Sequence, residues 1–147
     1  MELDGNGGWI YVLMTSADYN RFKVGRTSLN PLDRYKALRT GDPQLGFVVA
    51  YFVPASLWKL SHVEAALHQE FEQRILFLDD ESRSEWFIGT AETACQWIEW
   101  KFDEWMERPV SSMHLFGQGV ICRAYEDDLI HLYGPRPPLN PIDGLPM

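Results

Sequence analysis

The sequence predicts an α/β fold in which a small, mostly antiparallel three-stranded sheet is flanked by helices, in the chain order β-β-α-β-α. Trp9–Thr15 and Arg21–Thr27 are dense in β-branched and aromatic residues, and the turn-like segment between them predicts a hairpin. Two later stretches carry apolar residues at helical spacing and begin with residues that cap helices. The chain of 147 residues is long enough to form a core without disulfide or metal staples.

The first half of the chain supplies most of the sheet. Apolar residues lie on both faces of the first strand, which indicates a central and covered position. After the hairpin, Asn30 is placed to cap a helix that begins at Pro31 and ends near Gly41. Phe47–Val53 predicts the third strand, which Pro54 closes.

A longer helix is predicted from Ala55 to about Ile75, with Ser56 as its candidate cap. Its apolar stripe consists of Leu57, Leu60, Val63, Leu67 and Phe71. After this helix, Glu85–Phe87 predicts a short extended piece.

The C-terminal part is predicted to be a helix with an extension. The helix spans residues 90–107 and is rich in tryptophan. The pattern then weakens, although residues 120–125 predict one strand and residues 134–141 predict a proline-rich tail. We therefore divide the chain into a domain at residues 8–88 and a C-terminal helix with its extension, residues 89–147, packed on that domain.

Composition restricts the class of protein and its partners. The net charge of −8 argues against a general nucleic-acid coating protein. Residues 1–40 nevertheless carry six basic and four acidic groups, against seven basic and 17 acidic groups in the rest, so an anionic partner is expected at the N-terminal third. Two cysteines exclude a disulfide framework, and no apolar run is long enough to span a membrane. Because no secretory signal is visible, we expect a cytoplasmic protein.

The motifs that carry chemistry lie on the hairpin and the two helices that follow it. A tyrosine, a lysine, an arginine and one carboxylate are the parts needed to cut a phosphodiester with one metal ion. They occur as Trp9-Ile10-Tyr11, Lys23-Val24-Gly25, Arg34 and Glu64, followed by Glu85-Trp86-Phe87. This order over residues 8–88 resembles the GIY-YIG nucleases, and especially their phage-type branch, in which the second signature reads Lys-Ile-Gly.

The resemblance implies a metal-dependent endonuclease that hydrolyses phosphodiester bonds in DNA. Glu64 would be the single carboxylate that holds one Mg²⁺ or Mn²⁺ ion. Arg34 would grip the scissile phosphate and stabilise the charge that builds on it. Arg26 and Thr27 would contact backbone phosphates, and Lys36 would add a further cation for the substrate.

The resemblance places Tyr11 beside the attacking water, where it helps to take a proton. A phenol with a pKa of about 10 is a poor base unless a cation lowers that pKa. Lys23 stands where many members carry a second tyrosine, and it either supplies that cation, holds a phosphate oxygen or is itself the base. His68, one turn after Glu64, either orients the substrate or a water, or is a buried histidine in a hydrogen bond. Glu85 stands where members commonly carry a bracing asparagine, so a weak bracing contact to the substrate side is expected of it.

Two other functions stay open at this point. One is a nucleic-acid or protein-binding module whose nuclease site is vestigial or shielded by a partner. A protein partner would use the acidic C-terminal part and its aromatic helix, which carries Trp97, Trp100 and Trp105. The other is a nuclease that acts on single strands or RNA through exposed aromatic side chains. Metal-dependent cleavage separates the enzyme from the first alternative, and a panel of substrates separates it from the second.

Overall fold

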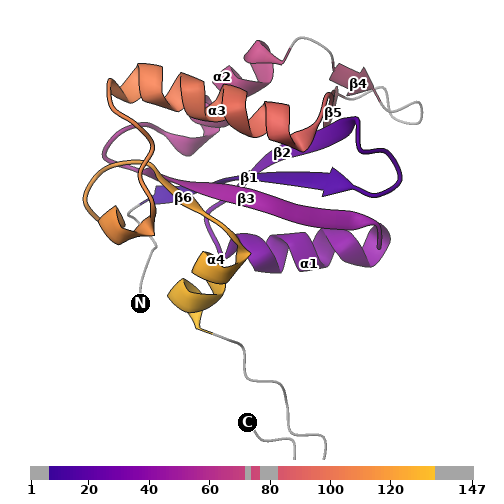
Figure 1. Ribbon diagram of the computed structural model, residues 1–147, viewed down its shortest axis with the longest axis horizontal. Coiled ribbons are helices and arrows are strands. Elements are labelled where there is room, and N and C mark those ends of the chain that lie inside the picture. Colours follow the sequence, from indigo (N-terminus) through magenta and orange to yellow (C-terminus); the bar gives the residue numbers. More distant parts are fainter. Residues whose placement is uncertain (1–6, 72–73, 77–82, 135–147) are drawn as a thin grey trace, which may run out of the picture.

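The computed structural model describes residues 7–71, 74–76 and 83–134, which form one six-stranded antiparallel sheet with helices on both faces (Figure 1). The strand order is β4-β5-β2-β1-β3-β6. The strands are β1 Gly7–Thr15, β2 Arg21–Thr27, β3 Leu45–Pro54, β4 Arg74–Leu76, β5 Arg83–Ile88 and β6 Cys122–Ala124. The α/β class is confirmed, whereas the predicted number of three strands is wrong because short strands extend the sheet at both edges.

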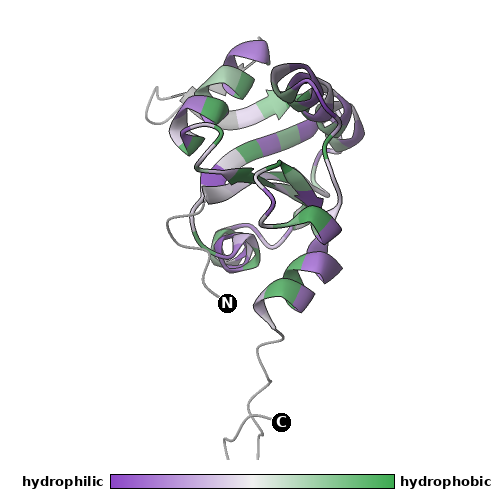
Figure 2. Cartoon of the chain, turned by 90° about the vertical axis from the view of Figure 1, so that its left-hand side faces the viewer, coloured by the Kyte–Doolittle hydropathy of each residue, from purple (hydrophilic) through white to green (hydrophobic). Residues whose placement is uncertain are grey.

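Four helices make the outer layers. They are α1 Pro31–Gly41, α2 Leu60–Glu70, α3 Ala91–Met106 and α4 Glu126–Tyr133, and a single 3₁₀ turn lies at Met113–Leu115. In Figure 1, α2 and α3 cover one face of the sheet, and α1 and α4 lie on the other. Figure 2 shows the same arrangement turned by 90°, with the strands between the two helical layers. The sheet is therefore the middle of three layers, and each of its faces has its own core.

β1 is the centre of the molecule because it pairs with β2 along one edge and with β3 along the other. Its successive residues point to opposite faces of the sheet. Ile10 and Val12 enter the core under α2 and α3, whereas Trp9, Tyr11 and Leu13 enter the core under α1 and α4. All five side chains are buried, so the predicted central and covered position of the first strand is confirmed.

Two helix starts follow directly from local sequence. The side chain of Asn30 accepts a hydrogen bond from the Leu32 backbone N–H at 3.0 Å, and Pro31 occupies the first turn of α1. The side chain of Thr90 accepts from the Thr93 backbone N–H at 3.2 Å and caps α3. Both predicted helix starts are confirmed, because each depends only on residues that are adjacent in the chain.

The predicted helix from Ala55 to Ile75 is too long at both ends. After Pro54 the chain first makes a turn, in which the N–H groups of Leu57 and Trp58 donate to the Pro54 carbonyl oxygen. α2 therefore begins after Lys59, and the prediction of Ser56 as its cap is wrong. At the other end the helix stops at Glu70, because residues 74–76 form β4 and pair with β5.

Residues beyond position 88 share the sheet and both cores with the residues before it. α3 places three buried side chains, Ala94, Ile98 and Phe102, in the core under α2 and α3. β6 pairs with β3, although it is shorter than the predicted strand at residues 120–125. α4 was not predicted, and its Leu129 joins the second core. Residues 135–141 of the predicted proline-rich tail lie outside the described residues.

A polar cluster joins α3 to β3 and β6. Glu99 on α3 accepts the hydroxyl of Tyr51 at 2.8 Å and both Nε and Nη2 of Arg123, each at 2.8 Å. Burial raises the pKa of Tyr51 above its usual value, and neighbouring Cys95 and Glu99 raise it further, so the phenol stays a donor. Burial likewise raises the pKa of the Cys95 thiol to about 11. The cluster therefore fixes α3 against the sheet through one carboxylate.

Glu99→Ala should destabilise the protein by about 1–3 kcal/mol, because the Tyr51 hydroxyl and the Arg123 guanidinium lose their shared acceptor. Glu104→Ala is the matched control on the same helix, because the Glu104 side chain is exposed and lies 3.8 Å from its partner Lys101. The control should stay within about 0.5 kcal/mol of the wild type. Urea unfolding of both variants measures the difference, and equal midpoints would show that the cluster adds no stability.

Candidate functional site

The outer edge of β2 is only partly covered by a strand. β5 pairs with β2 from Arg21 to Lys23, and within the described part of the chain no strand pairs with β2 beyond that point. α2 lies against the uncovered edge instead. His68 on α2 is buried, and its Nε2 donates to the Val24 carbonyl oxygen at 3.0 Å. The predicted histidine of the site thus holds the edge of β2 to α2.

Glu64 lies one turn before His68 on α2 and reaches the same edge. Its Oε1 accepts a hydrogen bond from Nε of Arg26 at 3.0 Å, and the two side chains form an ion pair. The Glu64 side chain is 15% exposed, whereas that of Arg26 is 48% exposed. The pair is therefore open to solvent on the arginine side and enclosed on the carboxylate side.

The second carboxylate oxygen of Glu64 has no hydrogen-bond partner in the described part of the chain. Oε2 is buried, and no hydrogen-bond donor meets it among the residues that the structure describes. Buried polar atoms are almost always satisfied by protein, water or an ion, so an orphaned carboxylate oxygen indicates that a further donor or cation belongs there. This environment distinguishes Glu64 from a solvated glutamate on a helix surface.

The Glu64 carboxylate suits a metal ion that has one protein ligand better than a metal ion that is enclosed by several protein ligands. The described residues contain no group of three or more His, Cys, Asp or Glu side chains that could hold a metal ion. Mg²⁺ usually keeps several waters and is bound through one or two carboxylates. Glu64, with one oxygen held by Arg26 and the other orphaned, fits that mode.

Tyr11 approaches the same stretch of β2 from the other face of the sheet. It pairs with Gly25 across the two strands and is 1% exposed. A Cβ atom on Gly25 would lie 2.5 Å from Cζ of Tyr11 and would also collide with its hydroxyl oxygen. The phenol ring therefore lies across Gly25, between Val24, which His68 contacts, and Arg26, which Glu64 contacts. Tyr11 and Glu64 lie on opposite faces of the sheet but meet β2 at neighbouring residues.

Lys23 lies on the face of β2 that carries Tyr11, together with an aromatic side chain from β5. Lys23 is the register partner of Trp86, and its Nζ lies 5.9 Å from the centre of the Trp86 ring. The guanidinium carbon of Arg21 lies 5.5 Å from the same ring. Because α1 packs on β1 and β3, these two cations and the indole lie beside that helix.

The remaining predicted residues lie around this edge. Arg34 and Lys36 are exposed on α1, and within the described chain no hydrogen bond or ion pair engages the Arg34 side chain. The hydroxyl of Thr27 accepts from the Leu29 backbone N–H at 3.1 Å, in the short link that leads into α1. Glu85 is part of β5, but its side chain lies outside the described residues.

Sequence reasoning missed two contacts of the site. The pairing of Arg26 with Glu64 joins residues 38 positions apart, and the sequence shows no local signal for it. Arg21 and Lys23 lie two residues apart on one strand, which places them on one face, but their shared contact with Trp86 depends on the pairing of β2 with β5. A glycine inside a strand is typical of a place where another group approaches closely, as the Tyr11 ring does at Gly25.

Comparison with known families identifies the domain. The family model of the T5orf172 domain matches residues 8–102, and the chain belongs to this family. The T5orf172 domain is a phage-associated domain that occurs in some endonucleases and is associated with nuclease or DNA-binding function. The match is to this family and not to a GIY-YIG model. Neither the curated proteins nor the solved structures gave a match. Among the described residues, no helix has both the length and the apolar character of a membrane span.

Gly25→Ala should cost about 1–3 kcal/mol of stability, because the added methyl group meets the Tyr11 ring in a packed core. Gly41→Ala is the matched control, because nothing lies within 4 Å of a Cβ atom at that position. Thermal unfolding followed by circular dichroism measures both variants. Equal melting temperatures would contradict the close packing of Tyr11 on Gly25.

Proposed function

We propose that the protein is a metal-dependent endonuclease that hydrolyses phosphodiester bonds in DNA at the edge of β2. The observation that carries the proposal is the orphaned Oε2 of Glu64, a buried carboxylate oxygen beside a cation in a domain family that occurs in endonucleases. The basic residues of the first 40 positions lie on β2 and on α1, which follows it, and they favour an anionic substrate. We further assign the chain to the phage-type branch of the GIY-YIG nucleases, on the order of its motifs.

Glu64 would hold one Mg²⁺ or Mn²⁺ ion through its free oxygen. When bound, such an ion neutralises the charge that develops on the oxygens of the reacting phosphate. Arg26 would orient the carboxylate by holding Oε1, while Oε2 stays available to the ion. The exposed part of the Arg26 side chain is then available to a neighbouring phosphate of the DNA strand.

We assign Tyr11 the role of the general base, which takes a proton from the attacking water. Its buried ring is held across Gly25, so its hydroxyl has a fixed position. Lys23 lies on the same face of β2, two residues from Gly25, and acts as the neighbouring cation. The reverse assignment, with Lys23 as the base, is the alternative. General base catalysis of this kind contributes typically about 10²–10⁴-fold to the rate.

Arg34 is assigned to the scissile phosphate. Three residues separate the end of β2 from the start of α1, so the first turn of α1 lies near the end of β2 that carries Arg26. The Arg34 side chain is exposed, and a guanidinium presents two parallel donors to a phosphate. Thr27 and Lys36 would contact the phosphates that flank the scissile phosphate on the DNA strand.

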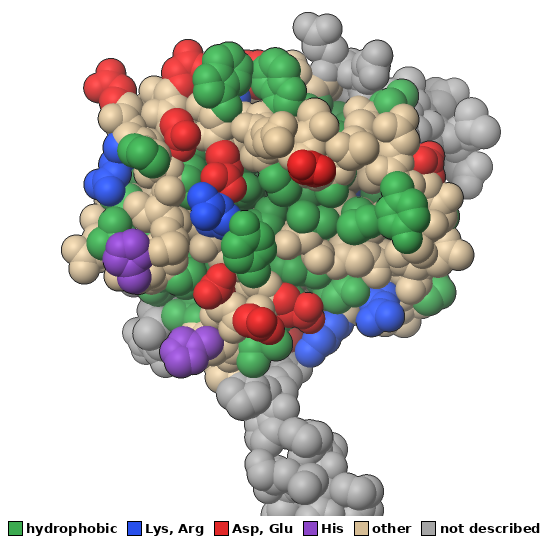
Figure 3. Space-filling view, in the orientation of Figure 1, with side chains coloured by type: hydrophobic (Ala, Val, Ile, Leu, Met, Phe, Trp, Pro, Cys, Tyr) green, Lys and Arg blue, Asp and Glu red, His purple; other side chains and the backbone are tan. Residues whose placement is uncertain are grey.

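A protein-binding function is the second candidate, and the exposed face of α3 favours it. Trp97 and Trp100 are 45% and 55% exposed, and their rings meet edge to face at 5.4 Å. Figure 3 shows large hydrophobic side chains next to acidic ones along the upper edge, where α3 lies. Exposed indoles of this kind are typical of contact surfaces. Such a partner would act beside the nuclease site, or in its place if that site is vestigial.

Glu64→Gln should abolish cleavage while the fold is kept, because the substitution preserves size but removes the charge that holds the ion. Cleavage of plasmid DNA in Mn²⁺, with EDTA as the metal-free reference, measures the effect. Glu70→Gln is the control on the same helix, because Glu70 pairs with Lys101 on α3 and does not contact Arg26. Wild-type cleavage by Glu64→Gln would remove Glu64 from the metal site.

Arg34→Lys should lower the cleavage rate by about 10²–10³-fold, because lysine keeps the charge but loses the two-donor fork. Binding of the same DNA in EDTA should stay within several-fold of the wild type. Arg39→Lys, on the last turn of α1, is the control for a loss of general basic charge. A parallel collapse of binding and cleavage would make Arg34 a docking residue instead of a catalytic one.

A further inference from the structure

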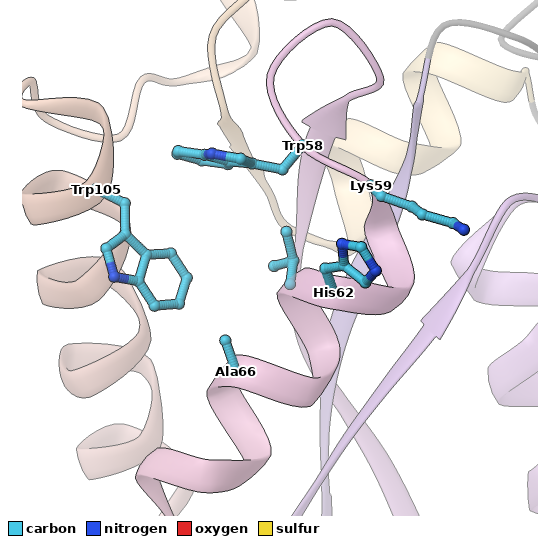
Figure 4. A pocket seen from close by; sticks show the side chains of 6 residues that line it. Trp58, Lys59, His62, Ala66 and Trp105 are labelled. Carbon is cyan, nitrogen blue, oxygen red and sulfur yellow. The ribbon is translucent and has the colours of Figure 1, made fainter.

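A pocket with a volume of about 380 Å³ lies between α2 and α3, away from the β2 edge. It is lined by Trp58, Lys59, His62, Val63, Ala66 and Trp105. Figure 4 shows Trp105 on α3 and Trp58 before α2 facing the side chains of His62 and Ala66 on α2. Its volume lies in the range of about 300–1,000 Å³ that is typical of small-molecule sites.

The walls of this pocket suit a flat aromatic group. The rings of Trp58 and Trp105 stand at 77° to each other with their centres 6.1 Å apart. A planar ligand can therefore stack on one indole while its edge meets the other. Val63 and Ala66 supply an apolar floor, and none of the described carboxylates lines the pocket.

The charges at the rim favour an anionic ligand. Lys59 and His62 are exposed and lie on the same side of the pocket, where His62 stands beside the hollow and the Lys59 side chain extends outward from it (Figure 4). On this side lies the start of α2, which has no side-chain cap and no acidic residue in its first turn. Glu70, further along α2, is paired with Lys101 at 3.3 Å. An aromatic cation would meet unfavourable charge here, whereas an aromatic group that carries a phosphate would not.

A path leads from the candidate site to this pocket. A second pocket of about 360 Å³ shares Trp58 and Lys59 with the first one and is also lined by Ser28 and Gly7. Ser28 follows Thr27 directly, at the end of β2 that carries Arg26. A DNA strand that runs from Arg26 past Ser28 would therefore reach Lys59 and the pocket beyond it.

We propose that the pocket between α2 and α3 binds one unpaired nucleobase of the DNA strand, with its phosphate at Lys59 and His62. The proposal rests on the proposed nuclease function and extends it, because it requires a substrate with a single-stranded part next to the cleavage site. Stacking of bases on aromatic side chains is largely independent of sequence, so the pocket selects strandedness and not a particular base. The apolar side chain of a protein partner would leave the cations at the rim without a counterpart.

The test compares two short fluorescein-labelled oligomers of equal length, an oligothymidine and an abasic strand, by anisotropy in EDTA. The full-length wild type should bind the oligothymidine about 5- to 150-fold more tightly, the range for stacking one base. Ala66→Leu fills the pocket without removing an aromatic ring and should abolish most of this preference while the abasic strand still binds. Ala65→Leu, at the exposed neighbouring position, is the matched control and should keep the preference.

Trp58→Leu gives a second readout if Ala66→Leu disturbs the packing of α2, and it should also reduce the preference for bases. An unchanged preference in folded Ala66→Leu and Trp58→Leu would overturn the proposal. A wild type that cleaves duplex DNA in Mn²⁺ but binds both oligomers equally would overturn the proposed nucleobase site and leave the proposed nuclease function standing. A wild type that neither cleaves DNA nor binds either oligomer would overturn the nuclease function and the pocket with it.

Discussion

β1 is paired with a strand along both edges and packed against helices on both faces. This pairing and packing fix the face of the sheet to which each β1 side chain points. A slip of one residue would move every apolar side chain of the strand to the opposite core. The register that results places Tyr11 opposite Gly25, where the missing side chain makes room for the phenol ring. The position of the Tyr11 ring is thus a consequence of the hydrophobic packing and register of β1.

Glu64 is held in a state that packing alone does not explain. Its ion pair with Arg26 satisfies one carboxylate oxygen, and burial of the other oxygen without a donor costs free energy. A glutamine or an apolar residue would serve the fold better at this point on α2. Buried polar groups that cost folding free energy are concentrated at binding and catalytic sites. The buried carboxylate of Glu64 beside the open edge of β2 therefore indicates a function. A metal ion held by Glu64 alone would leave its other ligand positions open to water and to a phosphate.

The parts of the fold that were predicted correctly are those determined by neighbouring residues. The caps at Asn30 and Thr90 and the hairpin of β1 and β2 each depend on a few adjacent positions. The excess length predicted for α2 arose because an apolar stripe continues through the turn at Leu57, and periodicity does not register a turn closed by the Pro54 carbonyl oxygen. β4 and β6 are three-residue strands whose pairing is decided by their partners. The same holds for the contacts of the candidate site, because the sequence offers Tyr11 and Glu64 as candidates but does not indicate that Arg26 pairs with Glu64.

The residues beyond the family match complete the second core. The match ends at position 102, yet the indole N–H of Trp9 donates to the Tyr133 hydroxyl at 2.8 Å, and Phe52 meets Phe116 edge to face at 4.8 Å. Without residues 113–133 this apolar surface of β1 and β3 would face water. Their cover lies on the β3 and β6 side of the sheet, because α4 packs on β3 and β6. Lys23 of β2 and Trp86 of β5 lie on the opposite side of β1 from β3 and β6, so residues 113–133 stabilise the domain without covering the edge at which a DNA strand would bind.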